Sequence, residues 1–204
     1  QVFPPDHKGP SPAARKFHWL NQALWDGGYV LHVPKGVSVE LPAKAEFRAA
    51  SGQPMPHNLV VLEDGAAATL IESYASANGD PATWLPQTEI ILGAGARLRY
   101  ILLQHTGSEA VYIGAHGVQQ GAESNLSFVS AHLGAKLEKA FMDVRMLAPK
   151  AQAQLVGLYC GTGAQRIHLD TFQHHVAPEC TTTLLIKGAL SDQARAVYRG
   201  MIRL

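Results

Sequence analysis

Short apolar runs with a period of two dominate the chain from residue 29 onward. This period places successive side chains on opposite faces of an extended strand, and Gly, Pro or Ala-Gly pairs separate most of the runs. No convincing helical pattern occurs in this part of the sequence, so we expect an all-β body. Besides segment 29–41, the expected strands are 59–62, 69–72, 89–92, 98–104, 126–129, 141–146, 155–159, 167–176, 181–186 and 196–204.

The first 28 residues follow a different pattern. The opening residues are Pro-rich and polar, which predicts an irregular lead-in. Phe17, Leu20 and Leu24 then recur at helical spacing. Ser11-Pro12 supplies a typical helix start and Gly27-Gly28 a typical stop. The pattern therefore predicts one short helix ahead of the β body.

A weak repeat underlies the strands. The segments VVLEDGAAATLIES, IILGAGARLRYILL and VQQGAESNLSFVS each contain an apolar run, a Gly-Ala turn and a second apolar run. We place their turns at Gly65, Gly95 and Gly121, and the segments around Pro149 and Pro178 continue the rhythm. A period in this range with two or three strands per repeat is typical of a solenoid, most simply a β-helix.

We therefore divide the chain into a lead-in plus helix, residues 1–28, and a β-helix core, residues 29–204. A jelly roll or β-sandwich also shows short strands at regular spacing, and the unequal repeat lengths leave that alternative open.

Composition narrows the function classes. Hydrophobic residues make up 47% of the 204 residues and charged residues 16%, as in soluble globular proteins. The net charge is +1 with scattered basic residues, which argues against nucleic-acid binding. No apolar run reaches the roughly 20 residues of a membrane span, and no signal-peptide core is visible. We read Cys160 and Cys180 as free thiols and expect a cytoplasmic protein.

The segment RIHLDTFQHHVAPEC, from Arg166 to Cys180, is the richest in metal-ligating residue types. In a strand, His168, Asp170 and His174 share one face, a set similar to the two-histidine, one-carboxylate site of Fe(II) oxygenases. However, Asp170 and His174 would lie about 13 Å apart at roughly 3.3 Å per residue. A paired, closely spaced zinc motif is also missing. An ordinary histidine–carboxylate pair on a solvent-facing strand is the simpler interpretation.

Other chemistry-bearing residues give weaker signals. His105, His116 and His132 are scattered, and we expect them to be surface or turn residues. No GxSxG elbow is present, and GAGAR at 93–97 lacks the Lys-Ser/Thr of a phosphate loop. A carbohydrate-active β-helix is disfavoured because the three tryptophans form no aromatic row.

Four segments together resemble the SufB/SufD family of iron–sulfur cluster assembly proteins. They are LNQALWDGGYVLHVPKGVSVELP, PHNLVVLEDGAAATLIESY, TEIILGAGARLRYILLQ and VGLYCGTGAQRIHLDTFQHHVAPECTTTLLIKGALSDQARAVYRGMI. The resemblance runs in order from about Phe17 to the last residue. APEC and KGALSDQARAV are more similar to the SufD branch, whereas YRG at 198–200 is more similar to SufB.

The resemblance implies a right-handed parallel β-helix and a scaffold subunit rather than an independent enzyme. It also implies pairing through the β-helix with a SufB-like or identical subunit, and binding of a SufC-type ATPase through a C-terminal helical domain that these 204 residues lack. We therefore expect the core of such a protein. No cofactor is expected in the isolated chain, whereas the assembled complex would carry a transient iron–sulfur cluster and, in some systems, a reduced flavin.

The resemblance assigns no cluster ligand to a residue here. Cys180 belongs to the APxC pattern and is the better candidate for a functional thiol, while Cys160 is expected in the core. His168, Asp170, His174 and Cys180 remain the candidate contacts for metal. The alternative function is a metal-dependent all-β enzyme that uses His168, Asp170 and His174.

Overall fold

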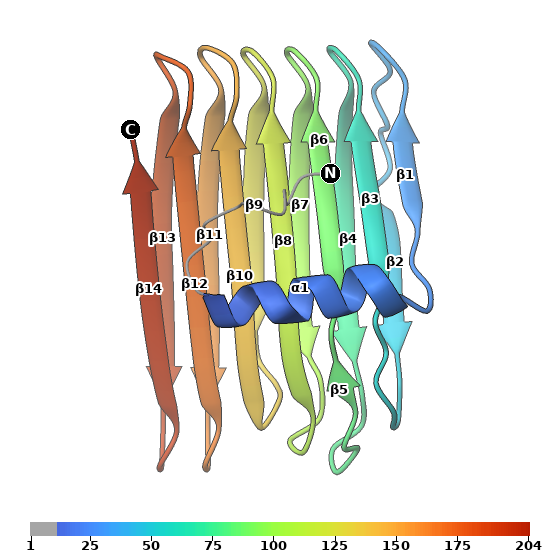
Figure 1. Ribbon diagram of the computed structural model, residues 1–204, viewed down its shortest axis with the longest axis vertical. Helices are drawn as coiled ribbons and strands as arrows, with labels where there is room; N and C mark the ends of the chain where they lie inside the picture. Colours follow the sequence, from blue (N-terminus) through green and yellow to red (C-terminus); the bar gives the residue numbers. More distant parts are fainter. Residues whose placement is uncertain (1–11) are drawn as a thin grey trace.

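The structure, a computed structural model, describes residues 12–204 and is a solenoid of two parallel β-sheets that face each other (Figure 1). In Figure 1 the near strands point up, the far strands point down, and successive coils move from β1 on the right to β14 on the left. This winding is right-handed, as expected.

The first sheet, near the viewer, contains β1 (Val30–Val33), β3 (His57–Leu62), β6 (Gln87–Leu92), β8 (Val111–Gln120), β10 (Leu137–Met146), β12 (Arg166–His175) and β14 (Arg195–Arg203), with β5 (Thr83–Trp84) paired beside β8. The second sheet contains β2 (Ala43–Arg48), β4 (Ala67–Ala75), β7 (Arg97–His105), β9 (Asn125–His132), β11 (Gln152–Gly161) and β13 (Thr181–Leu190). The chain alternates between the sheets and completes one coil with each pair of strands.

Each coil turns on a residue with a left-handed backbone. In chain order these residues are Gly36, Gly65, Gly95, Glu123, Lys150 and Glu179, at steps of 27 to 30 residues. The third repeat turn begins at Gly121, where the sequence placed it, and the Ser124 amide donates a hydrogen bond to the Gly121 carbonyl oxygen at 3.4 Å; its left-handed residue is Glu123. Gly121 is needed for a different reason: a Cβ there would lie 3.0 Å from the carbonyl oxygen of Leu92 in the preceding coil.

Inward side chains stack from coil to coil in register. In the second sheet, for example, Leu70, Tyr100, Phe128, Leu155 and Leu184 lie opposite one another on successive strands. Tyr100 and Phe128 are fully buried, with ring centroids 4.8 Å apart. Burial of each such side chain contributes about 1.5–3 kcal/mol, so the in-register stack is the main source of stability.

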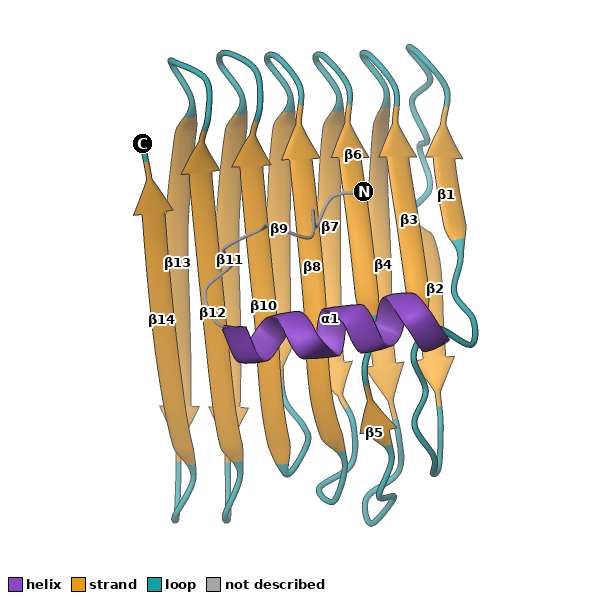
Figure 2. Ribbon diagram, in the orientation of Figure 1, coloured by secondary structure: helices purple, strands orange, loops and turns teal. Residues whose placement is uncertain are grey.

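The helix α1 (Pro12–Leu24) lies across the outer face of the first sheet (Figure 2). Asn21 anchors it, because its buried amide donates hydrogen bonds to the carbonyl oxygens of Met55, Pro56 and Leu85 at 2.8–3.2 Å. The predicted helix is confirmed, although its expected N-cap, Ser11, lies outside the described residues. Within residues 12–204, no helix combines the length and apolar character needed to span a membrane.

All ten strands expected after residue 41 are present. The sequence reasoning missed β2, β5 and β8. No strand was expected over β8, which contains Gly114 and Gly117, yet the strand is continuous. The ring of Tyr112 lies over Gly114, where a Cβ would be 2.5 Å from its Cε1 atom.

Candidate functional site

Asp170, the centre of the predicted polar site, lies on the outer face of β12 and forms an ion pair with Arg199 of β14. The two residues are directly opposite in the ladder. Arg199 Nε lies 2.7 Å from Asp170 Oδ1, and its second guanidinium nitrogen lies 2.8 Å from Oδ2. The pair is bidentate, so both carboxylate oxygens already accept a charge-assisted hydrogen bond. Asp170 is only 1% exposed, because Arg199 covers it.

His168 is the only other predicted site residue that joins Asp170, with Nε2 at 3.5 Å from Oδ1. Partial burial lowers the pKa of His168, and the nearby cations Lys139 and Arg199 lower it further, against the opposing effect of Asp170. Burial likewise lowers the pKa of Lys139. The pair is therefore a neutral imidazole beside a carboxylate that Arg199 neutralises.

His174 and Cys180 do not join this pair. His174 lies farther along the outer face of β12, with its ring centroid 5.9 Å from that of Phe172. Cys180 packs against the interior core, and its Sγ lies 3.4 Å from the carbonyl oxygen of Ala148. In the described part of the chain, no three His, Cys, Asp or Glu side chains are placed to hold a metal ion. The metal-dependent enzyme thus remains a prediction without a preformed site.

A second polar cluster, inside the solenoid, escaped the sequence reasoning. Glu72 of β4 is completely buried, and its carboxylate accepts hydrogen bonds from Tyr29, Asn58, Tyr74 and Thr88 at 2.5–3.2 Å. Nε2 of His116, on β8, lies 3.5 Å from Glu72 Oε1. Burial alone would raise the pKa of Glu72, but the contacts with His116 and the two tyrosine hydroxyls outweigh it and lower that pKa.

A second buried histidine–carboxylate pair lies next along the solenoid axis. Nδ1 of His132 is 2.5 Å from Glu138 Oε1, and its Nε2 is 3.0 Å from Ser130 Oγ. A void of about 20 Å³, room for roughly one water molecule, lies beside His116, Ser130 and His132. Because both pairs are closed off from solvent, we interpret them as structural polar contacts that fix the register of the coils.

The expectation that His116 and His132 are surface residues is therefore wrong. They are 2% and 3% exposed, because each occupies an inward position of its strand. The sequence did carry a signal for this burial. His116 lies four residues after Tyr112 and His132 four residues after Phe128, so each histidine is on the same face of its strand as a buried aromatic residue. His105, by contrast, lies at the exposed end of β7, where a surface residue was expected.

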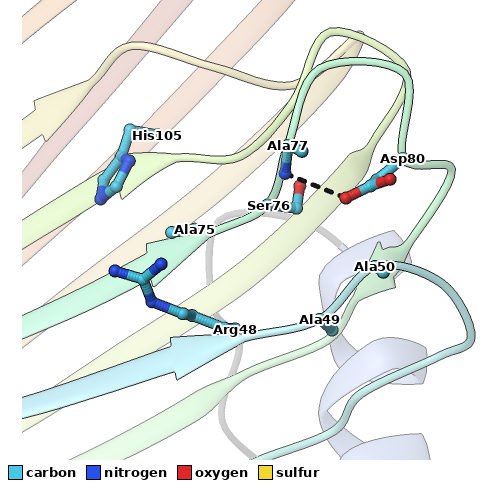
Figure 3. A pocket seen from close by; sticks show the side chains of 8 residues that line it. All are labelled: Arg48, Ala49, Ala50, Ala75, Ser76, Ala77, Asp80 and His105. Atoms are coloured by element: carbon cyan, nitrogen blue, oxygen red, sulfur yellow. Dashed lines mark hydrogen bonds between the residues drawn. The ribbon is translucent and has the colours of Figure 1, made fainter.

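A depression of about 470 Å³ lies at the carboxyl ends of β2, β4 and β7 (Figure 3). Its charged or titratable lining residues are Arg48, Asp80 and His105, and each has a local partner. Arg48 pairs with Glu46, Asp80 accepts a hydrogen bond from the backbone of its own loop at 2.9 Å, and His105 lies 3.0 Å from Ser73 Oγ. The depression therefore gathers no set of free groups for chemistry.

Comparison with known families decides the identity. The family model described as "SUF system FeS cluster assembly, SufBD core domain" matches residues 47–204. The chain belongs to the SufBD family. The match covers the coils from the end of β2 to β14, and it includes Asp170, Arg199 and both buried histidine–carboxylate pairs.

Similar proteins carry the same family name. Iron–sulfur cluster assembly SufBD family proteins from Staphylococcus saprophyticus, Staphylococcus epidermidis and Staphylococcus haemolyticus are each 26% identical to the chain over 200 residues. The aligned region covers 94% of this chain but only 42% of each of these relatives. The chain thus spans less than half the length of the curated relatives it matches.

Proposed function

We propose that this SufBD-family chain is a non-catalytic scaffold of the SufD type in iron–sulfur cluster assembly. It would act by pairing through its β-helix with a SufB-like or identical subunit. The observation that supports this proposal most is the two-sheet parallel β-helix, which the SufBD core-domain model matches over residues 47–204.

The scaffold role agrees with the finding that the main polar clusters already have partners within the chain. Arg199 neutralises the outer carboxylate of Asp170, and the inner histidine–carboxylate pairs have no access to solvent. The assembled complex would bind an iron–sulfur cluster transiently and, in some systems, a reduced flavin. A SufC-type ATPase would bind through parts of the protein beyond these residues. His168, His174 and Cys180 are the contacts of this chain to test for metal or sulfur.

The test is sedimentation of the chain alone and mixed with a SufB-type subunit. We expect a dimer of the chain alone or a heterodimer with the SufB-type subunit. A monomer at about 100 µM that also fails to bind the SufB-type subunit would contradict the proposal.

A further inference from the structure

The outer face of the second sheet carries a continuous aliphatic row. Its members lie directly opposite one another on five neighbouring strands. None is buried, and the last is 50% exposed. We call this row the outer ladder; it consists of Ile71, Ile101, Val129, Val156 and Leu185.

The next outward positions widen the apolar surface. Leu103, Ala131 and Leu158 lie opposite one another two residues farther along their strands, and Leu158 is 45% exposed. Leu133, just past the end of β9, is 47% exposed. Contiguous apolar surface of this kind on a protein marks an interaction site more often than isolated exposed residues do.

On the first sheet, a helix covers part of the outer face and buries the apolar residues beneath it. Figure 2 shows α1 in front of the first sheet, and among the described residues no helix lies over the second. Beneath α1, Ala115 and Phe141 are only 8% and 6% exposed. In the described part of the chain the two outer faces therefore differ in cover, and the outer ladder has no helix over it.

The size of the outer ladder matches one helix. Five parallel strands spaced about 4.8 Å apart span roughly 19 Å. A 13-residue helix such as α1 is about 20 Å long at 1.5 Å per residue. One helix of three to four turns, laid across the strands as α1 is, would cover the whole row.

The charged residues around the outer ladder indicate the charge that such a helix should carry. The outward positions of the second sheet carry five cationic side chains and a single carboxylate, Glu46, although the net charge of the chain is only +1. Glu46 is already paired with Lys44 and Arg48. Among the described residues, no ion pair compensates the other three cations, which are Arg97, Arg99 and Lys187.

A second copy of this chain is a poor occupant, because two such faces would bring like charges together. We propose that the outer ladder docks an amphipathic helix of a partner protein, with an apolar stripe on the ladder and Asp or Glu residues on its flanks. The proposal rests on the outer ladder and the charges beside it, and it does not depend on the pairing of subunits proposed above.

The test is photocrosslinking in the full-length protein, inside the cells that make it. The crosslinker p-benzoylphenylalanine is placed at position 158 and, as a control, at position 41, which is 81% exposed on the first coil. Mass spectrometry identifies the crosslinked peptide. We expect position 158, and not position 41, to capture another protein through a peptide with helical apolar spacing and net negative charge.

That peptide, resynthesised, is the probe for affinity. Arg99→Glu and Leu158→Glu each replace a side chain at the surface, so we expect folding to be retained and binding to weaken at least tenfold. Leu41→Glu should bind as the wild type does. Crosslinks to a second copy, to another segment of the same polypeptide, to a peptide without acidic flanks, or to nothing would each overturn the proposal. Equal affinity of Arg99→Glu and the wild type would also overturn it.

Discussion

Glu72→Gln isolates the contribution of the buried carboxylate, since the two side chains have nearly the same shape. Glu72 accepts hydrogen bonds from Tyr29, Asn58, Tyr74 and Thr88 and lies beside His116. The amide removes the charge from all of these contacts and turns one acceptor oxygen into a donor. A hydrogen bond to a charged group contributes about 1.5–3 kcal/mol, and these losses are not additive. We therefore expect a destabilisation of roughly 3 kcal/mol.

Guanidinium unfolding followed by circular dichroism measures this loss at pH 7. For a chain of this size, roughly 3 kcal/mol corresponds to a fall in Tm of about 6–12 °C. Glu109→Gln is the matched control, because Glu109 is an exposed residue paired with Lys136. We expect the control to change stability by no more than about 1 kcal/mol, as for other surface ion pairs.

The direction of the pKa shift of Glu72 determines how the free energy of unfolding depends on pH. The folded-state pKa of Glu72 is lowered from its ordinary value of 4.5. The carboxylate therefore contributes stability above that value, and the contribution is lost as the pH falls through the folded-state pKa. The gap between wild type and Glu72→Gln should narrow below about pH 4.5. A loss under about 1 kcal/mol at pH 7 would refute a charged acceptor in the core.

Three further outcomes follow from the structure. Lys139→Ala should raise the pKa of His168, because one of the cations that lower it is gone, and histidine ring shifts in NMR measure this. Gly114→Ala should cost about 1–3 kcal/mol, since the new Cβ overlaps the ring of Tyr112, whereas Gly27→Ala, with open space around it, should be neutral in the same thermal melt. His168→Ala should leave the metal content of the purified protein unchanged in elemental analysis; loss of stoichiometric iron or zinc would revive the metal-dependent enzyme.

Strand periodicity predicted most of the fold, because a solenoid repeats one local rule. In apolar runs such as 98–104 and 126–129 all inward residues are buried, so the period of two can be recognised in the sequence. The rule failed in β8, where Gly114 is compensated by a ring two residues away. In the third turn the left-handed residue is Glu123 and not the glycine at which the turn begins, a conformation that non-glycine residues rarely adopt. Neither feature is visible in the alternation of apolar and polar residues.

The polar site was predicted only in part, for a related reason. Strand parity correctly placed His168 and Asp170 on one face, but the partner that neutralises Asp170 is Arg199, which is 29 residues later and adjacent only through the coil register. The same register brings Glu72 close to His116 across the interior. Each of these partners lies at least one coil away in sequence, so pairwise spacing within a segment could not identify it.

The outer face of the second sheet is an apolar surface over which the described residues place no helix. Parallel sheets usually have both faces covered. On the first sheet α1 provides cover, and Phe141 beneath it is buried. The second sheet presents an equally ordered row, the outer ladder, with uncompensated arginines beside it. Cover by an acidic helix would remove both the exposed aliphatic surface and the excess positive charge.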